Sequence, residues 1–243
     1  MTGLAEDLEV GVRGSQLHAQ RWGSRAAPLV IGFPGLSGTA ERCSLLGERI
    51  GGDELQLVAL DPRGRGKSDT TAPGSYGWEN HARDALAVAD ALGFERFSMI
   101  GMSMGGSVAM KTAELDATRL DRVVLIDIAG RVDRGVGAVI AGEIDNLGLY
   151  HDPADPAAVE EDRAYTFSQD PYDRWRFLTM PTLLVRATRE MRPGCGFVVP
   201  VADRDRFVRE VPKAILVEVD ADHRTIADHP DTAHAIRSFL VPS

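Results

Sequence analysis

The sequence lacks the features that would place the protein in a membrane or on a nucleic acid. No apolar run approaches the roughly 20 residues that a membrane-spanning helix requires. Acidic residues outnumber basic ones by 36 to 27, and the formal charge of -9 disfavours nucleic acid or an anionic membrane surface as a partner. The first ten residues have neither a basic stretch nor an apolar core, so we expect no signal peptide.

Cysteine and aromatic residues are also scarce. The two cysteines, Cys43 and Cys195, are far apart in the sequence and form no metal-binding or redox motif. Free thiols are the simple interpretation, and a single disulfide stays open. Only 6% of the residues are aromatic, which gives no sign of an aromatic cage. These absences indicate a cytoplasmic protein that has neither a nucleic acid nor a membrane as its partner, and they leave the oligomeric state open.

Short apolar segments alternate with helical patterns along most of the 243 residues. A β-hairpin pattern spans residues 8–22, and patterns of buried strands follow at 28–33, 55–60, 97–100, 123–127, 181–186 and 214–219. Helical patterns lie at 41–50, 79–92, 104–115, 202–210 and 232–240. This alternation predicts an α/β protein with a mostly parallel, doubly wound sheet around one substantial core.

The most informative stretch is the strand–turn–helix pattern around Ser103. Residues 101–105 read Gly-Met-Ser-Met-Gly and fit G-x-S-x-G, the nucleophile elbow, in which a sharp turn holds a serine at its tip. Side chains at Gly101 or Gly105 would collide with the crossing strand and helix, which gives both glycines a physical role. Ser103 is therefore the predicted nucleophile, and an ordinary serine in a glycine-rich turn is the alternative.

Residues 131–178 interrupt the alternation of strands and helices. The segment carries acidic, arginine and aromatic side chains, among them Tyr150, Tyr165 and Trp175, and has no strand pattern. We expect a short helical cap or lid that covers Ser103, with residues 1–130 and 179–243 forming the core. A surface excursion without a role in substrate binding is the alternative.

Two further segments complete a set of motifs with the elbow. Pro34-Gly35-Leu36 follows a strand pattern, and residues 61–68 read DPRGRGKS, a turn-rich loop whose charges we expect to pair with one another. Together with the elbow, these segments resemble the α/β-hydrolase fold over almost the whole chain. The resemblance implies an eight-stranded, mostly parallel sheet with a helical cap after the sixth strand. It also implies hydrolysis of a carbonyl or related bond, as in serine esterases and lactonases of bacteria.

A serine hydroxyl needs a base within hydrogen-bonding reach to act as a nucleophile near neutral pH. His223 directly follows the strand pattern at 214–219, on the same edge of the sheet as Ser103, and the family places its base in this loop. His229 is the rival, although a solvated loop position suits it better. We therefore predict His223 as the base.

Two carboxylates compete for the role of the acid, which orients the histidine and stabilises its protonated form. Asp127 ends an apolar strand pattern, where a buried carboxylate without a partner would be costly. Some bacterial esterases that resemble this chain use an aspartate 24 residues beyond the serine, as 127 minus 103 gives here. Glu190 lies after the seventh strand, where most of the family carries its acid, but in Ala-Thr-Arg-Glu instead of Gly-x-x-Asp. We prefer Asp127 and keep Glu190 as the alternative acid.

The oxyanion of a tetrahedral intermediate requires two preorganised amide donors. The Met104 amide, at the start of the helix after the serine, is one predicted donor. The resemblance puts the second donor in the loop after the strand at 28–33, where Leu36 fits by its distance to the next helix. Phe33 is the alternative, and Pro34 stands where the family usually has His.

These predictions combine into a serine hydrolase that cleaves a carboxylic ester or lactone of a small molecule through an acyl-enzyme. No cofactor and no metal are expected. A C–C bond hydrolase or an acyltransferase with the same triad is one alternative. A non-catalytic ligand-binding protein on a hydrolase scaffold is the other.

Overall fold

One eight-stranded sheet forms the centre of the computed structural model, which describes residues 5–146 and 154–241. The strand order is β1-β2-β4-β3-β5-β6-β7-β8. The strands are β1 (Glu6–Val12), β2 (Ser15–Trp22), β3 (Leu29–Phe33), β4 (Gln56–Leu60), β5 (Phe97–Met102), β6 (Leu120–Ile126), β7 (Thr182–Ala187) and β8 (Ala214–Val219). β2 runs antiparallel to β1 and β4, whereas the neighbouring strands in the series β4-β3-β5-β6-β7-β8 pair in parallel. The predicted mostly parallel sheet of eight strands is confirmed.

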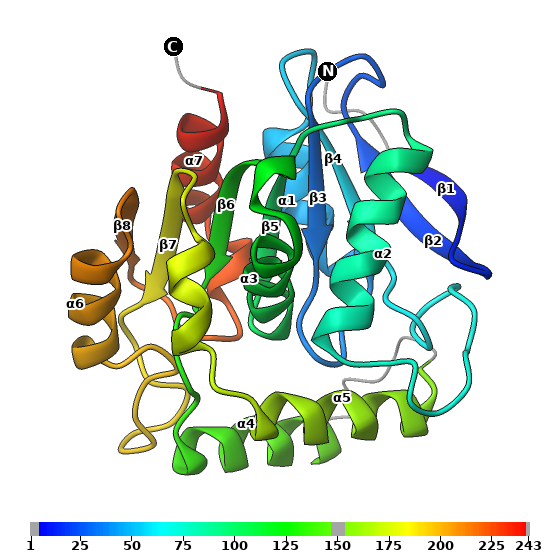
Figure 1. Cartoon of the computed structure of the whole chain (residues 1–243). Coiled ribbons are helices and arrows are strands. Elements are labelled where there is room, and N and C mark those ends of the chain that lie inside the picture. Colours follow the sequence, from blue (N-terminus) through cyan, green and yellow to red (C-terminus); the bar gives the residue numbers. More distant parts are fainter. Residues whose placement is uncertain (1–4, 147–153, 242–243) are drawn as a thin grey trace.

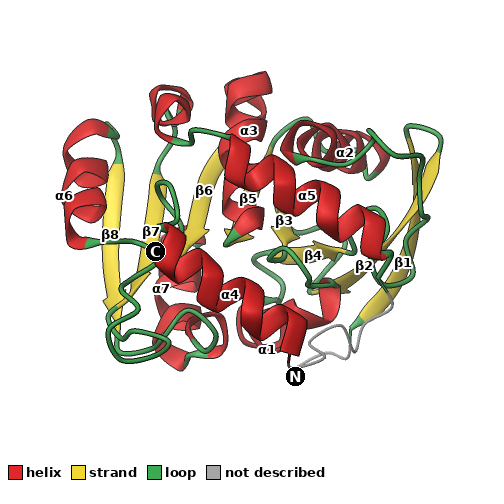
Figure 2. Cartoon of the chain, turned by 90° about the horizontal axis from the view of Figure 1, so that it is seen from below, coloured by secondary structure: helices red, strands yellow, loops and turns green. Residues whose placement is uncertain are grey.

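Helices cover both faces of the sheet, as Figures 1 and 2 show. This explains why β3, β4 and β7 are mostly apolar in sequence and are buried along their whole length. One face carries α2 (Trp78–Ala91), α3 (Met104–Asp116) and α6 (Val201–Glu210), and the other carries α1 (Ser44–Ile50) and α7 (Pro230–Leu240). The sheet therefore separates two apolar clusters, one on each face.

A helical insertion separates β6 from β7. It contains α4 (Arg134–Asn146), α5 (Pro156–Ser168) and a 3-10 helix, Tyr172–Phe177. Asp155 caps α5 by accepting a hydrogen bond from the Ala157 amide. α4 and α5 lie across the carboxyl ends of the parallel strands (Figures 1 and 2). The structure thus has the helical cap that was expected after the sixth strand, whereas Tyr150 lies outside the described residues.

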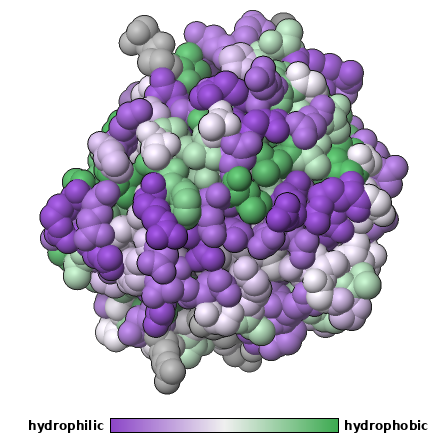
Figure 3. Space-filling view, in the orientation of Figure 1, coloured by the Kyte–Doolittle hydropathy of each residue, from purple (hydrophilic) through white to green (hydrophobic). Residues whose placement is uncertain are grey.

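The face of the molecule in Figure 3 is mostly hydrophilic, with apolar residues in scattered patches. Both cysteines are free thiols. Within the described residues, no helix has both the length and the apolar character needed to cross a bilayer.

Candidate active site

The turn between β5 and α3 gives Ser103 an unusual backbone conformation. Its φ is 51° and its ψ is -120°, a region that residues with side chains rarely occupy. A Cβ on Gly101 would lie 2.1 Å from the Gly105 carbonyl oxygen, and one on Gly105 would lie 2.1 Å from the Phe33 carbonyl oxygen. The chain crosses itself closely here, so glycine is needed at both positions, as the sequence predicts.

The structure brings His223 and Asp127 together from loops that are 96 residues apart. The His223 Nδ1 lies 2.9 Å from the Asp127 Oδ2, and the Ala187 amide donates to the Asp127 Oδ1 at 3.0 Å. Both side chains are buried, with 7% of His223 and 1% of Asp127 exposed. A carboxylate can only accept hydrogen bonds, so Nδ1 carries the proton and Nε2 of the neutral ring is left as a base.

Glu190, the alternative acid, binds its own loop instead. Its Oε2 accepts from the Gly194 amide at 2.7 Å and its Oε1 from the Gly196 amide at 2.9 Å. Its carboxylate thereby holds the turn that follows β7. His229, the rival base, caps α7 by accepting a hydrogen bond from the Asp231 amide at 3.2 Å.

The loop after β3 lies against the serine. A Cβ on Gly35 would be 3.6 Å from the Ser103 Cβ, and a turn is closed by the Gly38 amide donating to the Gly35 carbonyl. Leu36 is a central residue of this turn, so the turn's own hydrogen bond does not use its amide. Phe33, the alternative donor, is the last residue of β3 and pairs with Gly101 of β5. Met104 begins α3, and helix geometry leaves the amides of the first turn without intrahelical acceptors.

Ser103 and His223 line one cavity of about 240 Å³. Its walls are mainly apolar, and Ile140 of α4 contributes to them from the insertion. The other lining residues include Phe33, Leu36, Leu46, Ile100, Met102, Ile126 and Met191. Within the part of the chain that the structure describes, no three His, Cys, Asp or Glu side chains gather where they could hold a metal ion.

Sequence patterns do not reveal the polar side of this cavity. Arg42, Cys43 and Asp228 reach it from the segment before α1 and from the loop before α7. Burial, together with the carboxylates of Asp228 and Asp61, raises the pKa of the Cys43 thiol to about 12. Isolated polar residues far apart in the chain form no recognisable motif, so nothing in the sequence could have identified them.

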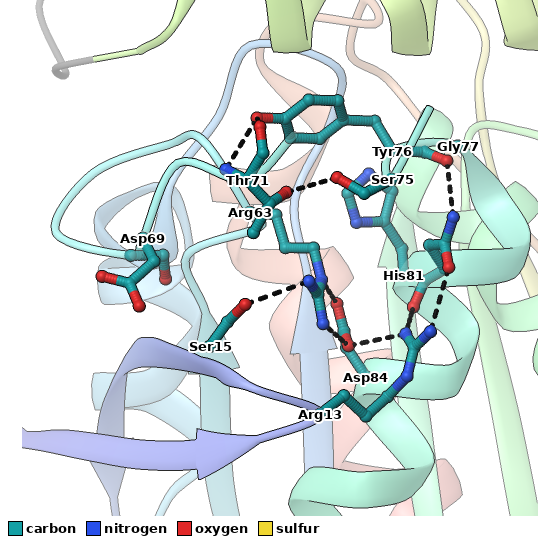
Figure 4. Close-up of polar contacts among 12 residues, drawn as sticks. Arg13, Ser15, Arg63, Asp69, Thr71, Ser75, Tyr76, Gly77, His81 and Asp84 are labelled. Carbon is teal, nitrogen blue, oxygen red and sulfur yellow. Dashed lines mark hydrogen bonds and ion pairs between the residues drawn. The ribbon is translucent and has the colours of Figure 1, made fainter. Parts of the chain in front are cut away.

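The expectation that the charges of the 61–68 loop pair with one another is wrong. Arg63 binds Asp84 of α2, and Arg65 binds Asp162 of α5. Figure 4 shows Arg63 reaching Asp84 together with Arg13. Gly64 and Gly66 have positive φ, and the tight turns that they form direct the arginines toward different elements.

A family model described as the alpha/beta hydrolase fold matches residues 28–147, which contain the elbow, Asp127 and the loop of Leu36. The crystal structure of E-2-(acetamidomethylene)succinate hydrolase superposes on this one with a TM-score of 0.84. The match covers 98% of this chain and 99% of that chain at 20% identity. This chain is an α/β-hydrolase fold protein.

The chain is similar in sequence to N-formylmaleamate deformylase from Pseudomonas putida, with 34% identity over 140 residues. It is also similar to a serine hydrolase-like protein from Danio rerio, with 27% identity over 206 residues. The matches cover 57% and 81% of this chain, but only 52% and 62% of the relatives. The enol-lactonase from Burkholderia xenovorans shares the fold, with a TM-score of 0.79, 21% identity and coverage of 96% of this chain and 99% of that chain.

Proposed function

We propose that this protein is a serine hydrolase that cleaves a carboxylic ester or lactone of a small molecule. The observation that carries the proposal is the buried His223–Asp127 hydrogen bond, beside the cavity that Ser103 and His223 both line. The names of the relatives, a deformylase and a serine hydrolase-like protein, support a hydrolytic reaction.

In the proposed reaction, Nε2 of His223 takes the proton of the Ser103 hydroxyl while its oxygen attacks the substrate carbonyl carbon. Asp127 stabilises the imidazolium that forms. His223 then gives the proton to the leaving alcohol, and an acyl-enzyme remains. A water molecule, deprotonated by His223, attacks this ester and forms a tetrahedral intermediate. As that intermediate collapses, the acid is released and His223 returns the proton to the Ser103 oxygen.

The Leu36 and Met104 amides are the proposed donors to the oxyanion, with Phe33 as the alternative to Leu36. An amide donor of this kind contributes about 10²–10³ to the rate, because the negative charge develops only in the transition state. The position of Leu36 in a turn beside Ser103 supports this choice, since the turn does not use its amide.

An amide bond is a second candidate substrate, since two relatives are named N-formylmaleamate deformylase and E-2-(acetamidomethylene)succinate hydrolase. The same three side chains also serve C–C bond hydrolases and acyltransferases. Steady-state assays with 4-nitrophenyl esters, small lactones, N-formyl and N-acetyl enamides and a 1,3-diketone would separate these chemistries. If only the enamides are turned over, amide cleavage replaces ester cleavage as the proposed reaction.

The decisive experiment is covalent labelling with a fluorophosphonate, measured by intact mass and mapped by peptide sequencing. We expect one adduct on Ser103, and none in Ser103→Ala, which keeps a small side chain at the elbow. Failure to label the wild type would refute the hydrolase and favour a ligand-binding protein on the same scaffold.

A further inference from the structure

Arg65 lies between the proposed oxyanion loop and the helical insertion. Its Nε and Nη2 both donate to the Leu36 carbonyl, at 3.2 and 2.9 Å. The same Nη2 donates to the Asp162 Oδ2 at 2.7 Å, and both side chains of this ion pair are completely buried. One guanidinium thus joins the turn beside Ser103 to a carboxylate on α5.

Asp162 is also bound by two residues at the start of α2. Its Oδ1 accepts from the Gly77 amide at 2.6 Å, and the His81 Nε2 lies 2.9 Å from its Oδ2. A buried charge pair is costly to desolvate, so its partners must be well placed for the folded state to keep it. Asp162 is therefore held by Gly77 and His81 independently of its contact with Arg65.

The start of α5 is also bound to the loop that carries Arg65. The Asp155 amide donates to the Gly64 carbonyl at 2.8 Å, and Arg65 forms an isolated antiparallel bridge with Ala154. A Cβ on Gly64 would lie 2.6 Å from the Ala158 Cβ, so the two backbones are in close contact. A movement of α5 is thus transmitted to Arg65 through both main chain and side chain.

We propose that Arg65 is a positioning residue that couples the packing of the insertion to the orientation of the Leu36 amide. The inference rests on the proposed function, because it assigns that amide to the oxyanion. The carbonyl and the amide of Leu36 meet at one Cα, so a fork of two hydrogen bonds on the carbonyl restricts the amide as well. Loss of the fork displaces the donor, and small displacements at a reacting centre are costly to the rate.

The same loop provides a matched control. Arg63 and Asp84 form a second buried ion pair, with 6% and 2% of their side chains exposed. Arg63 also donates to the Ser15 hydroxyl at 3.1 Å, and Figure 4 shows these contacts with β2 and α2. A purely structural effect of a lost ion pair should be the same at both positions, whereas a positioning effect should appear only at Arg65 and Asp162.

The test compares Asp162→Asn with Asp84→Asn, and Arg65→Lys with Arg63→Lys, by two measurements. Hydrogen–deuterium exchange follows residues 34–40, which include Leu36 and the hydrogen-bonded amides of Gly38 and Ala40. Fluorophosphonate labelling and ester turnover follow Ser103. Arg65→Lys keeps a positive charge for Asp162 but removes the fork, because an ammonium group cannot reproduce the geometry of a guanidinium.

We expect faster exchange at residues 34–40 in Asp162→Asn and Arg65→Lys, with kcat reduced about 10- to 100-fold and KM little changed. Asp84→Asn and Arg63→Lys should keep the exchange of this segment and the kcat of the wild type. Unchanged exchange in the first pair, or equal increases in both pairs, would overturn the coupling. Hydrogen–deuterium exchange can be measured on an inactive protein. A wild type that fails to label would therefore reject the proposed function, while the exchange of residues 34–40 would still test the coupling.

Discussion

At the scale of single residues, two of the three described non-glycine residues with positive φ lie in the candidate active site. Among the described residues other than glycine, Arg13, Ser103 and Asp127 have positive φ, at 50°, 51° and 46°. Arg13 belongs to the tight turn of the β1–β2 hairpin, where positive φ is favoured. The other two are the proposed nucleophile and acid, and such strain persists only where the surrounding structure enforces it.

Replacing Asp127 by Asn should reduce kcat by about 10⁴-fold while leaving the fold intact, because an amide no longer holds His223 in the required tautomer. Glu190→Gln is the control, since that carboxylate binds the Gly194 and Gly196 amides. Ester turnover and the rate of Ser103 labelling would be measured for both variants. A collapse in Glu190→Gln with retained activity in Asp127→Asn would move the acid to the loop after β7.

Cys43 should be a poor nucleophile although it lines the cavity. Its pKa of about 12 is three units above the ordinary value of 9.0, so its thiolate fraction at pH 8 is about 1,000-fold lower than that of an ordinary thiol. Alkylation of the native protein by iodoacetamide, followed by peptide mass spectrometry, should therefore modify Cys195 long before Cys43. Equal rates at the two cysteines would contradict the raised pKa of the Cys43 thiol.

At the scale of secondary-structure elements, the crossing of α3 over the end of β3 limits what the elbow can accept. Gly105→Ala would place a Cβ 2.1 Å from the Phe33 carbonyl oxygen, so backbone must move, and we expect a loss of about 3 kcal/mol in unfolding free energy. Gly52→Ala meets no atom within 4 Å and should change stability by less than about 0.5 kcal/mol. Urea unfolding of the two variants checks this difference, and equal losses would contradict the close crossing.

Patterns within single elements could be predicted from the sequence, whereas contacts between distant elements could not. The strands and helices of the core lie within a few residues of their expected positions, because burial on both faces demands continuous apolar runs. β6 begins at Leu120, earlier than expected, since Asp121 and Arg122 interrupt its apolar pattern without ending the strand.

In the candidate site too, residues in local patterns could be predicted, whereas contacts between distant segments could not. Ser103 lies in a local motif, and His223 and Asp127 each follow a strand. Their strand-end positions, together with the resemblance to the family, favour a contact between them but leave Glu190 open as the acid. The partner of Arg65 is 97 residues away on a helix with little periodic pattern, and no local rule connects the two. For this reason the sequence predicts a self-contained loop at 61–68, although the loop joins three parts of the molecule.

At the scale of the whole molecule, buried charges join the insertion to the core. Arg65 and Asp162 are fully buried, as is His81 beside them, so the insertion cannot separate from the core without exposing or breaking an ion pair. Removing one partner of such a pair leaves an uncompensated charge, which typically costs about 3–5 kcal/mol. The stability of the insertion and that of the core should therefore be lost together.

This arrangement has a defined dependence on pH. Burial by itself would raise the pKa of Asp162, but the His81 ring, the Arg65 guanidinium and the Gly77 amide outweigh it and hold the pKa below 3.8. The ionised carboxylate thus stabilises the fold above that unfolded-state value, and its contribution is lost as the pH falls through the lower pKa of the folded state.

Asp162→Asn should consequently lower the unfolding free energy at about pH 5, and the gap to the wild type should narrow below about pH 4. Urea unfolding at a series of pH values measures this gap, with Glu79→Gln as a control that removes an exposed carboxylate paired with Arg83. A gap that is unchanged at low pH would mean that the charge of Asp162 does not hold the insertion. A gap that closes only for Asp162→Asn would trace the acid sensitivity of the insertion to one carboxylate on α5.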